Sequence, residues 1–435
     1  MTDMSKNSKA SGWATDDYVK SLEKRQKSER RFRRMGLGAI LIALALLATL
    51  LFSIVGKGYT AFVQTFITLD ITFSEKVVDK NGTRDLEDLR GASYGNLVRN
   101  ALRAKFPDVK DRKDLRTLFG LISKSSTQEL RTMVMDDPNL IGKTIPVRFL
   151  AAADVDMFEK GYISRDNTED NRRIKDNEII WLDQLKADGN ISTHFNTRFL
   201  TGGDSREPEV AGIWGAMVGS FYTLIVTFCI SFPIGVLSAI YLEEFAPKNK
   251  LTDLIEVNIN NLAAVPSIVF GLLGLAIFLN VAHLPRSAPI VGGMTLALMT
   301  LPTIIIASRA AIRAVPDSIR QAALGLGASP QQAAFHHVLP LAMPGILTGT
   351  IIGLSQALGE TAPLLMIGMV AFIADIPGGF NEPATVLPVQ IFLWADSPER
   401  GFVEKTSGAI MVLLAFLIFM NAIAVLLRKK FERRW

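Results

Sequence analysis

The sequence predicts an all-α polytopic membrane protein with six transmembrane helices and an extracytoplasmic α+β insertion between helices 1 and 2. Of the 435 residues, 49% are hydrophobic, and the mean hydropathy is +0.27. The apolar residues are gathered in long uninterrupted runs, which is typical of segments that cross a hydrocarbon core about 30 Å thick. Residues 57–209 are polar instead. Basic residues cluster beside the apolar runs, so the net charge of +5 favours membrane flanks over nucleic-acid binding.

The N-terminal part predicts a basic cytoplasmic segment followed by a first membrane helix. Residues 1–34 are polar and end in SLEKRQKSERRFRR, and the apolar run MGLGAILIALALLATLLFSIV follows at 35–55. A cleaved signal peptide is the alternative, but the apolar part is long and the charged part before it is extended. We therefore expect a retained helix at 35–56 with its basic side in the cytoplasm.

The insertion at 57–209 predicts a small α+β unit. Segments 61–73 and 143–150 have the alternation of strands, whereas 93–106, 112–123 and 126–135 have helical spacing. The single cysteine, Cys229, lies in an apolar run, so no intrachain disulfide framework is available to hold the insertion. Its function does not follow from its residues.

The second half predicts five further spans within a transmembrane region at 210–428. They are expected near 213–242, 262–282, 289–312, 342–372 and 407–427. An even number places both termini on one side, and the basic tail at 429–435 assigns that side to the cytoplasm. Loops 243–261 and 313–341 are then inside, and 283–288 and 373–406 outside. The acidic residues of loop 243–261, among them Glu243, Glu244 and Glu256, depart from the positive-inside pattern.

Prolines and glycines recur inside these spans. Internal proline is tolerated where neighbouring helices or a cavity satisfy the freed carbonyl groups, so repeated breaks favour a transport path over an anchor. The prolines are Pro233, Pro266, Pro302, Pro344 and Pro363. Small residues recur every four positions at Gly345, Gly349, Gly353 and Ala357, a stripe typical of close helix packing.

The sequence offers no set of residues for covalent chemistry. The segment Gly142-Lys143-Thr144 fails the Walker A motif because Asp137 stands where the first glycine is required. The four histidines show no metal-ligand spacing. We therefore expect a protein that is not an enzyme and that binds no metal or other cofactor in this chain.

One carboxylate stands inside a predicted span. Glu360 lies within QALGETAPLLMIG, and an acidic group there costs about 2.5–3.5 kcal/mol on insertion scales. Gln356 lies one turn earlier, Thr361 follows directly, and Arg309 is a possible counter-charge in the fourth span. We assign these four as candidate substrate-path residues. The alternatives are a Glu360–Arg309 pair that only holds the bundle together, and an arginine that extends to the interface.

The polar segment QAALGLGASPQQAAFHHVLP at 321–340 predicts a helix–turn–helix between two spans. Gly325 and Gly327 interrupt a helix that begins near Asp317, and Ser329 with Pro330 caps and starts the next one. Such a segment is typical of a surface that docks another protein.

This segment resembles the cytoplasmic motif of the permease subunits of ABC importers, which reads Glu-Ala-Ala, three residues, Gly, nine residues, Ile, one residue, Leu-Pro. Gln321, Ala322, Ala323, Gly327, Leu339 and Pro340 fit that spacing without a gap. Gln321 replaces the usual Glu, and His337 replaces the usual Ile. The resemblance implies the type I permease fold, and a coupling role for these six residues, which would dock into a groove of an ATPase subunit.

A narrower resemblance, to the phosphate transport permeases of the PstA family, covers roughly residues 210–435. It is carried by GETAPLL at 359–365, VPDSIRQAALGLGA at 315–328 and LPVQIFLWADSPE at 387–399. It implies a multi-pass permease in the bacterial inner membrane, with both termini cytoplasmic. The implied partners are a second permease subunit (PstC-like), a homodimeric ATPase (PstB-like) that binds ATP and Mg, and an extracytoplasmic phosphate-binding protein (PstS-like). The alternatives are a permease for molybdate, sulfate or phosphonate, and a membrane-anchored extracytoplasmic ligand sensor.

Overall fold

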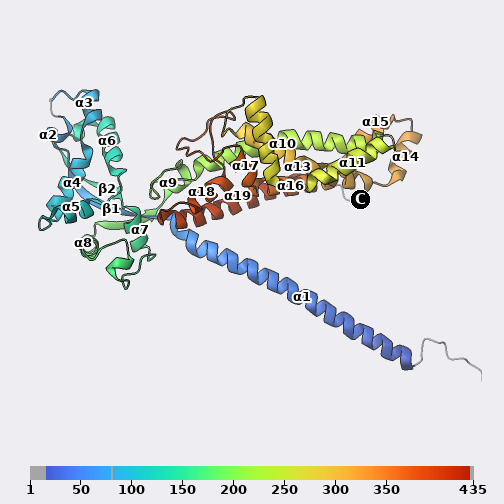
Figure 1. Cartoon of the computed structure of the whole chain (residues 1–435), viewed down its shortest axis with the longest axis horizontal. Coiled ribbons are helices and arrows are strands. Elements are labelled where there is room, and N and C mark those ends of the chain that lie inside the picture. Colours follow the sequence, from blue (N-terminus) through green and yellow to red (C-terminus); the bar gives the residue numbers. More distant parts are fainter. Residues whose placement is uncertain (1–15, 80–81, 432–435) are drawn as a thin grey trace, which may run out of the picture. The chain divides into compact units, whose positions relative to one another are not determined.

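The computed structural model describes residues 16–79 and 82–431, and the chain divides into two units, 1–56 and 57–435 (Figure 1). The first unit is formed by α1 (Asp16–Gly58), a helix of 43 residues whose last residues belong to the second unit. It includes the whole first predicted span and continues into the basic segment before it. Long apolar side chains such as Leu41 and Phe52 are exposed on it, as expected of a helix whose surroundings are lipid or other helices.

The insertion contains a three-stranded antiparallel sheet of order β2-β1-β3. The strands are β1 (Val63–Thr72), β2 (Thr144–Leu150) and β3 (Ile191–Phe195). The first two confirm the predicted strands, and they pair in a register that sets Phe66 opposite Leu150. The third strand was not predicted, because five residues are too few to give a clear alternating pattern.

Eight short helices accompany this sheet in the described part of the insertion. They are α2 (Glu75–Val78), α3 (Leu86–Gly91), α4 (Tyr94–Lys105), α5 (Arg112–Phe119), α6 (Ser126–Asp136), α7 (Ala153–Glu159), α8 (Asp176–Ala187) and α9 (Thr197–Thr201). Of these, α4 and α7 contact β1. The three predicted helices correspond to α4, α5 and α6. Alternate residues of β1, such as Ile67 and Ile71, are fully buried against them together with Phe149 and Leu102. This alternation follows from the two-residue period of a strand.

The remaining helices form an elongated bundle in which α10, α13, α16 and α19 run alongside one another (Figure 1). The bounds are α10 (Trp214–Ile240), α11 (Lys250–Ala263), α12 (Ser267–Gly274), α13 (Pro289–Arg313), α14 (Asp317–Gly325), α15 (Pro330–Gln332), α16 (Leu339–Gly359), α17 (Ala362–Met366), α18 (Leu387–Ala395) and α19 (Gly401–Phe431). Single π-helical turns extend α10 over Tyr241–Phe245 and α12 over Leu275–Val281, and a third joins α15 to α16.

The predicted small-residue stripe is a helix contact. A Cβ atom added at Gly345 would lie 2.7 Å from the Cβ of Ala311, and one added at Gly349 would lie 2.2 Å from that of Ala307. Because side chains larger than hydrogen do not fit there, α16 and α13 can approach only with glycine at these positions.

Five described helices are long and apolar enough to cross a membrane, and a bent helix pair raises the count to six if it forms one span. The prediction of one straight span at 262–282 is wrong, because this part of the chain belongs to the bent pair. The chain bends by 101° between α11 and α12, and α11 lies where an inside loop was expected. The break falls at Ala264–Pro266, since proline cannot donate the backbone hydrogen bond that a continuous helix needs there.

The predicted span at 342–372 is also wrong in its bounds. The helix begins earlier than predicted, at Pro330, and Pro340 does not interrupt it. The helix ends at Gly359 rather than at residue 372. Pro340 stands in the first turn of α16, where its missing N–H is tolerated. The expected loop at 373–406 likewise contains α18.

A buried ion network connects the insertion to the first turn of α19. The Lys160 ammonium lies 2.6 Å from Asp156 and 2.8 Å from Glu404, and all three side chains are at most 5% exposed. Asp156 also accepts a hydrogen bond from the backbone N–H of Thr65 in β1. The Tyr162 hydroxyl donates to the carbonyl of Lys57, directly after the first unit. A buried charge is stable only when it is paired, so this network fixes the sheet against α19.

We predict that Lys160→Ala lowers the free energy of unfolding by about 3–5 kcal/mol, because the carboxylates of Asp156 and Glu404 stay buried and lose the ammonium with which both pair. The measurement is thermal or chemical unfolding of the purified chain in detergent. Lys105→Ala is the control: this lysine pairs with Asp188, and the two side chains are 32% and 42% exposed. It should cost about 0–1 kcal/mol. Equal losses from the two variants would contradict a stabilising role for the buried network.

Candidate coupling site and substrate path

The predicted helix–turn–helix forms between α13 and α16. The first helix, α14, ends at Gly325, and Gly327 follows in the left-handed backbone region with φ of +87°. The Ser329 hydroxyl then accepts a hydrogen bond from the N–H of Gln332, whose side chain accepts one from the N–H of Ser329. This reciprocal capping starts α15 with Pro330 in its first position, as the sequence indicates.

The motif residues divide into exposed and buried positions. Gln321, Ala322 and Gly327 are exposed, Ala323 is buried, and Leu339 and Pro340 are half-buried. Sequence reasoning missed three apolar side chains that the same segment exposes, Leu324, Phe335 and Leu326, the last with 91% of its surface accessible. For Leu324 and Leu326, the signal that could have found them is their position next to Gly325 and Gly327 in a polar segment. Together the three side chains form an apolar surface on an otherwise polar turn.

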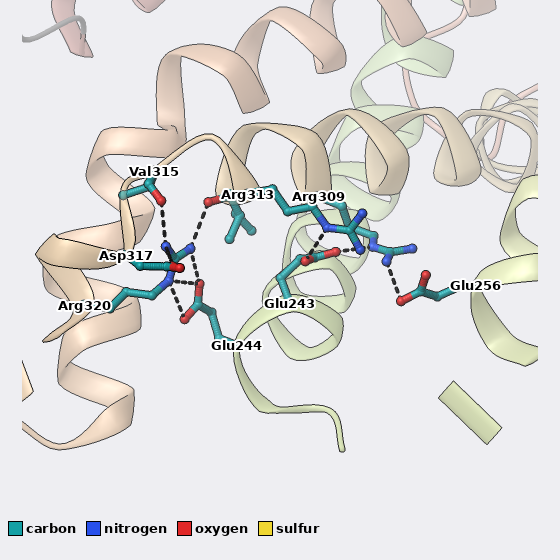
Figure 2. Close-up of polar contacts among 9 residues, drawn as sticks. Glu243, Glu244, Glu256, Arg309, Arg313, Val315, Asp317 and Arg320 are labelled. Carbon is teal, nitrogen blue, oxygen red and sulfur yellow. Dashed lines mark hydrogen bonds and ion pairs between the residues drawn. The ribbon is translucent and has the colours of Figure 1, made fainter. Parts of the chain in front are cut away.

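Arg320 fixes α14 to the bundle (Figure 2). Its guanidinium donates to both carboxylate oxygens of Glu244, at 2.8–3.2 Å, and to the carbonyls of Ile312 and Val315 at the end of α13. It also pairs with Asp317, one turn earlier. The hydrogen bonds that the Arg320 guanidinium donates to Glu244 raise its pKa above the ordinary value. The group therefore stays charged, and α14 is connected to α10 and α13 at once.

A second arginine pairing lies beside the first. Arg309 is 7% exposed and lies 2.6 Å from Glu243 and 2.5 Å from Glu256 of α11, and the more exposed Arg313 shares Glu243 at 2.7 Å (Figure 2). These contacts account for the acidic residues that depart from the positive-inside pattern. They neutralise arginines on the neighbouring helix rather than facing solvent alone.

The candidate counter-charge for Glu360 is therefore wrong. Arg309 lies level with Gly345 and Gly349, which pack against Ala311 and Ala307 on either side of it. Glu360 comes eleven residues after Gly349, about 16 Å further along the helix at 1.5 Å per residue. The two side chains are too far apart to pair, and Arg309 has two nearer carboxylates.

Glu360 occupies the break between α16 and α17. Its backbone is extended, with φ of −76° and ψ of 127°, and Thr361 forms the start of α17. Within the described residues, no ion pair involves the Glu360 side chain. Glu360 and Thr361 are half-buried, and Gln356 is exposed one turn earlier. The structure therefore brings three of the four predicted path residues together and places Arg309 elsewhere.

The helices that follow the two breaks, α12 and α17, pack on each other. A Cβ atom added at Gly271 of α12 would lie 2.6 Å from the Cα of Pro363 in α17. Gly274 packs equally closely on Thr295 of α13. The helix after the first break and the helix after Glu360 are thus in contact in one region of the bundle. Discontinuous membrane helices leave backbone groups free for a ligand or water, so this region is the candidate substrate path.

We predict that Arg320→Ala speeds amide hydrogen exchange across α14 about tenfold or more. It removes hydrogen bonds to a charged partner, each contributing about 1.5–3 kcal/mol, and leaves Glu244 unpaired. The measurement is hydrogen–deuterium exchange of the purified chain. Arg313→Ala is the matched control, because Glu243 keeps Arg309 and the side chain of Arg313 is 62% exposed. Unchanged exchange in α14 would show that Arg320 does not fix it.

Comparison with known proteins divides the chain into two matched parts. Residues 231–435 match the family described as binding-protein-dependent transport system inner membrane component. Residues 19–169 match a domain of unknown function, DUF3333. The helix–turn–helix at 321–340, called the coupling segment below, and both helix breaks lie within the first of these ranges. Most of the insertion lies in the second.

Individual relatives and solved structures each match part of the chain. The chain is 31% identical over 227 residues to the phosphate transport system permease protein PstA 2 of Mycobacterium bovis, covering 52% of this chain and 74% of the relative. It is 36% identical over 169 residues to the probable ABC transporter permease protein YqgI of Bacillus subtilis, covering 39% of this chain and 57% of the relative. Among solved structures, the MetNI methionine ABC transporter is 18% identical with a TM-score of 0.38, over 51% of this chain and 95% of that one.

Proposed function

The chain belongs to the PstA family of binding-protein-dependent transport system inner membrane components, and we propose that it is the permease subunit of an ATP-driven phosphate importer. The observation that carries this proposal is the coupling segment. It exposes Leu326 and its apolar neighbours at the end of the bundle, while Arg320 fixes its base to α10 and α13. A surface that is apolar, exposed and rigidly mounted is suited to docking another protein.

The proposed partner at this surface is an ATPase subunit, present in two copies, that binds ATP and Mg. Closure of the ATPase would push on α14, and Arg320 would pass the displacement to α10 and α13, which both contact it. The other proposed partners are a second permease subunit of the same family, which encloses the path together with this chain, and an extracytoplasmic phosphate-binding protein that delivers the substrate. In this arrangement the chain crosses the bacterial inner membrane six times with both termini in the cytoplasm.

The proposed substrate path passes the two helix breaks. Glu360, Gln356 and Thr361 offer a carboxylate, an amide and a hydroxyl at the break between α16 and α17. A carboxylate next to an anion is favourable when it accepts a hydrogen bond from a protonated phosphate oxygen, or when it orients a cationic group from the second permease. A fully ionised tetrahedral anion such as sulfate has no proton to donate, which supports phosphate over sulfate. Arg309 remains a predicted path residue, but its carboxylate partners favour a role in holding the coupling end together.

The proposal is tested by uptake of radiolabelled phosphate into proteoliposomes that contain the assembled complex, the binding protein and internal ATP. We expect ATP-dependent uptake that unlabelled phosphate competes away and that sulfate and molybdate leave unchanged. Glu360→Gln should lower the maximal rate about tenfold, a change of ~1.4 kcal/mol, because the amide cannot accept the same charged hydrogen bond.

Glu382→Gln is the control for this assay. Glu382 accepts a hydrogen bond from the N–H of Gly378 in an exposed loop, and the amide oxygen can replace that acceptor. If molybdate or sulfate competed with labelled phosphate as strongly as unlabelled phosphate does, the substrate would be a different oxyanion. Full activity in Glu360→Gln would remove this residue from the path.

The coupling surface is tested by Leu326→Glu. We expect the variant to insert and fold, since a side chain that is 91% exposed supports no packing. It should lose co-purification with the ATPase subunit, because a charge would be buried without a partner in the apolar contact. Leu326→Met keeps the apolar surface and should retain binding. Equal binding by both variants would show that Leu326 is outside the ATPase contact.

A further inference from the structure

An arginine surface lies on the insertion, at the pair of helices α4 and α5. Arg99 and Arg103 stand one turn apart on α4, and their guanidinium carbons lie 5.8 Å and 5.4 Å from the ring centroid of Phe119 on α5. Arg112 and Arg116 share the face of α5 that carries Phe119, since residues three, four and seven apart lie on one side of a helix. All four arginines are exposed, and Phe119 is half-buried between the two rows.

These arginines have no carboxylate partners in the described part of the chain. Some other basic residues of the insertion are paired: Arg165 with Asp183, Arg198 with Glu129, and Lys105 at the end of α4 with Asp188. Arg99 approaches only the amide oxygen of Asn96, at 3.5 Å. The ring of Phe119 restrains two of the guanidinium groups without neutralising them, as cation–π contacts do.

The charge of the insertion is strongly uneven. Residues 57–209 contain 24 Lys and Arg and 25 Asp and Glu, but residues 94–119 alone contain seven basic and three acidic side chains. The remainder of the insertion therefore has 17 basic and 22 acidic side chains. A nearly neutral unit is thus divided into one basic end, over α4 and α5, and an acidic remainder. Such a division creates a field that orients a charged partner.

We propose that this arginine surface, formed by Arg99, Arg103, Arg112 and Arg116 around Phe119, docks an acidic face of the extracytoplasmic binding protein. The inference rests on the proposed function, which supplies that partner and places the insertion outside the membrane. It gives the domain of unknown function a role: it captures the loaded binding protein and holds it near the permease.

Three features favour a protein over a small anion at this surface. The two arginines on α4 are about 6 Å apart along the helix, and so are the two on α5. The surface that all four cover is therefore broader than one tetrahedral oxyanion. Arginine and aromatic side chains are the types enriched at the centres of protein interfaces, and lysine is depleted there. Restraining the guanidinium groups on the Phe119 ring also lowers the entropy lost when a partner orders them.

The test measures binding of the purified phosphate-binding protein to the assembled complex in nanodiscs, by surface plasmon resonance at several salt concentrations. We expect Arg99→Glu/Arg103→Glu to lower the association rate about tenfold or more at low salt and to flatten its salt dependence. The dissociation rate should change less. Arg99→Lys/Arg103→Lys should keep most of the association rate, because it keeps the charge.

The matched control is Arg84→Glu/Arg90→Glu. Both residues are exposed on the insertion outside the arginine surface, and the double substitution makes the same change in net charge. Its association rate with the binding protein should stay within about twofold of the wild-type rate. Equal effects of the two double variants would overturn the inference, because only total charge would then matter.

Two further outcomes separate this inference from the proposed function. If the wild-type complex transports phosphate and binds the binding protein, but Arg99→Glu/Arg103→Glu binds it equally well, the inference is overturned and the proposed function stands. If Arg99→Glu/Arg103→Glu lowered the association rate only in nanodiscs that contain phosphatidylglycerol, the arginine surface would bind anionic lipid. That result would also overturn the inference. A wild-type complex that does not bind the protein at all overturns both.

Discussion

The coupling end of the bundle depends on two consecutive glutamates that follow α10. Neighbouring residues on a helix point about 100° apart, so Glu243 and Glu244 reach different helices. Glu243 pairs with Arg309 and Arg313 of α13, whereas Glu244 pairs with Arg320 of α14. Charges in or beside an apolar environment need partners, and each arginine here finds its partner on another helix. Three helices are thereby held in one arrangement from which the coupling segment projects.

The opposite end of the bundle is fixed by the same kind of interaction. Lys160 joins the insertion to Glu404 at the start of α19, and the side-chain amide of Gln64 in β1 donates to the carbonyl of Glu209 just before α10. Between these two fixed ends lie α12 and α17, the helices that follow the breaks after α11 and after α16, and they pack on each other through Gly271 and Pro363. The candidate path thus lies between two ends of the bundle that are held by ion pairs and hydrogen bonds.

The two family matches correspond to two physical roles in the chain. The part that matches the transport component contains the coupling segment, the glycine contact of α16 on α13, and Glu360. The part that matches DUF3333 contains β1, β2, the helices α2 to α7 and the arginines over Phe119. The buried lysine network connects these parts, so a protein bound at the insertion would be connected through rigid contacts to α19. The proposed phosphate import needs the first part, and the further inference assigns the second part a role in delivery.

The sequence by itself determined the features that rest on local pattern. Apolar runs of about 20 residues identified most of the membrane helices, alternation identified β1 and β2, and spacing identified the coupling segment with its turn at Gly327. It also identified the glycine stripe, because small residues four apart share one helix face. Only the tertiary structure decided the 101° bend before α12, the end of α16 at Gly359, and the partners of Arg309 and Arg320. Arg320 pairs with a residue 76 positions away, and Lys160 with one 244 positions away. Such ion pairs form because the two residues are close in the folded protein. The periodicity of a single segment gives no information about which distant residue that is.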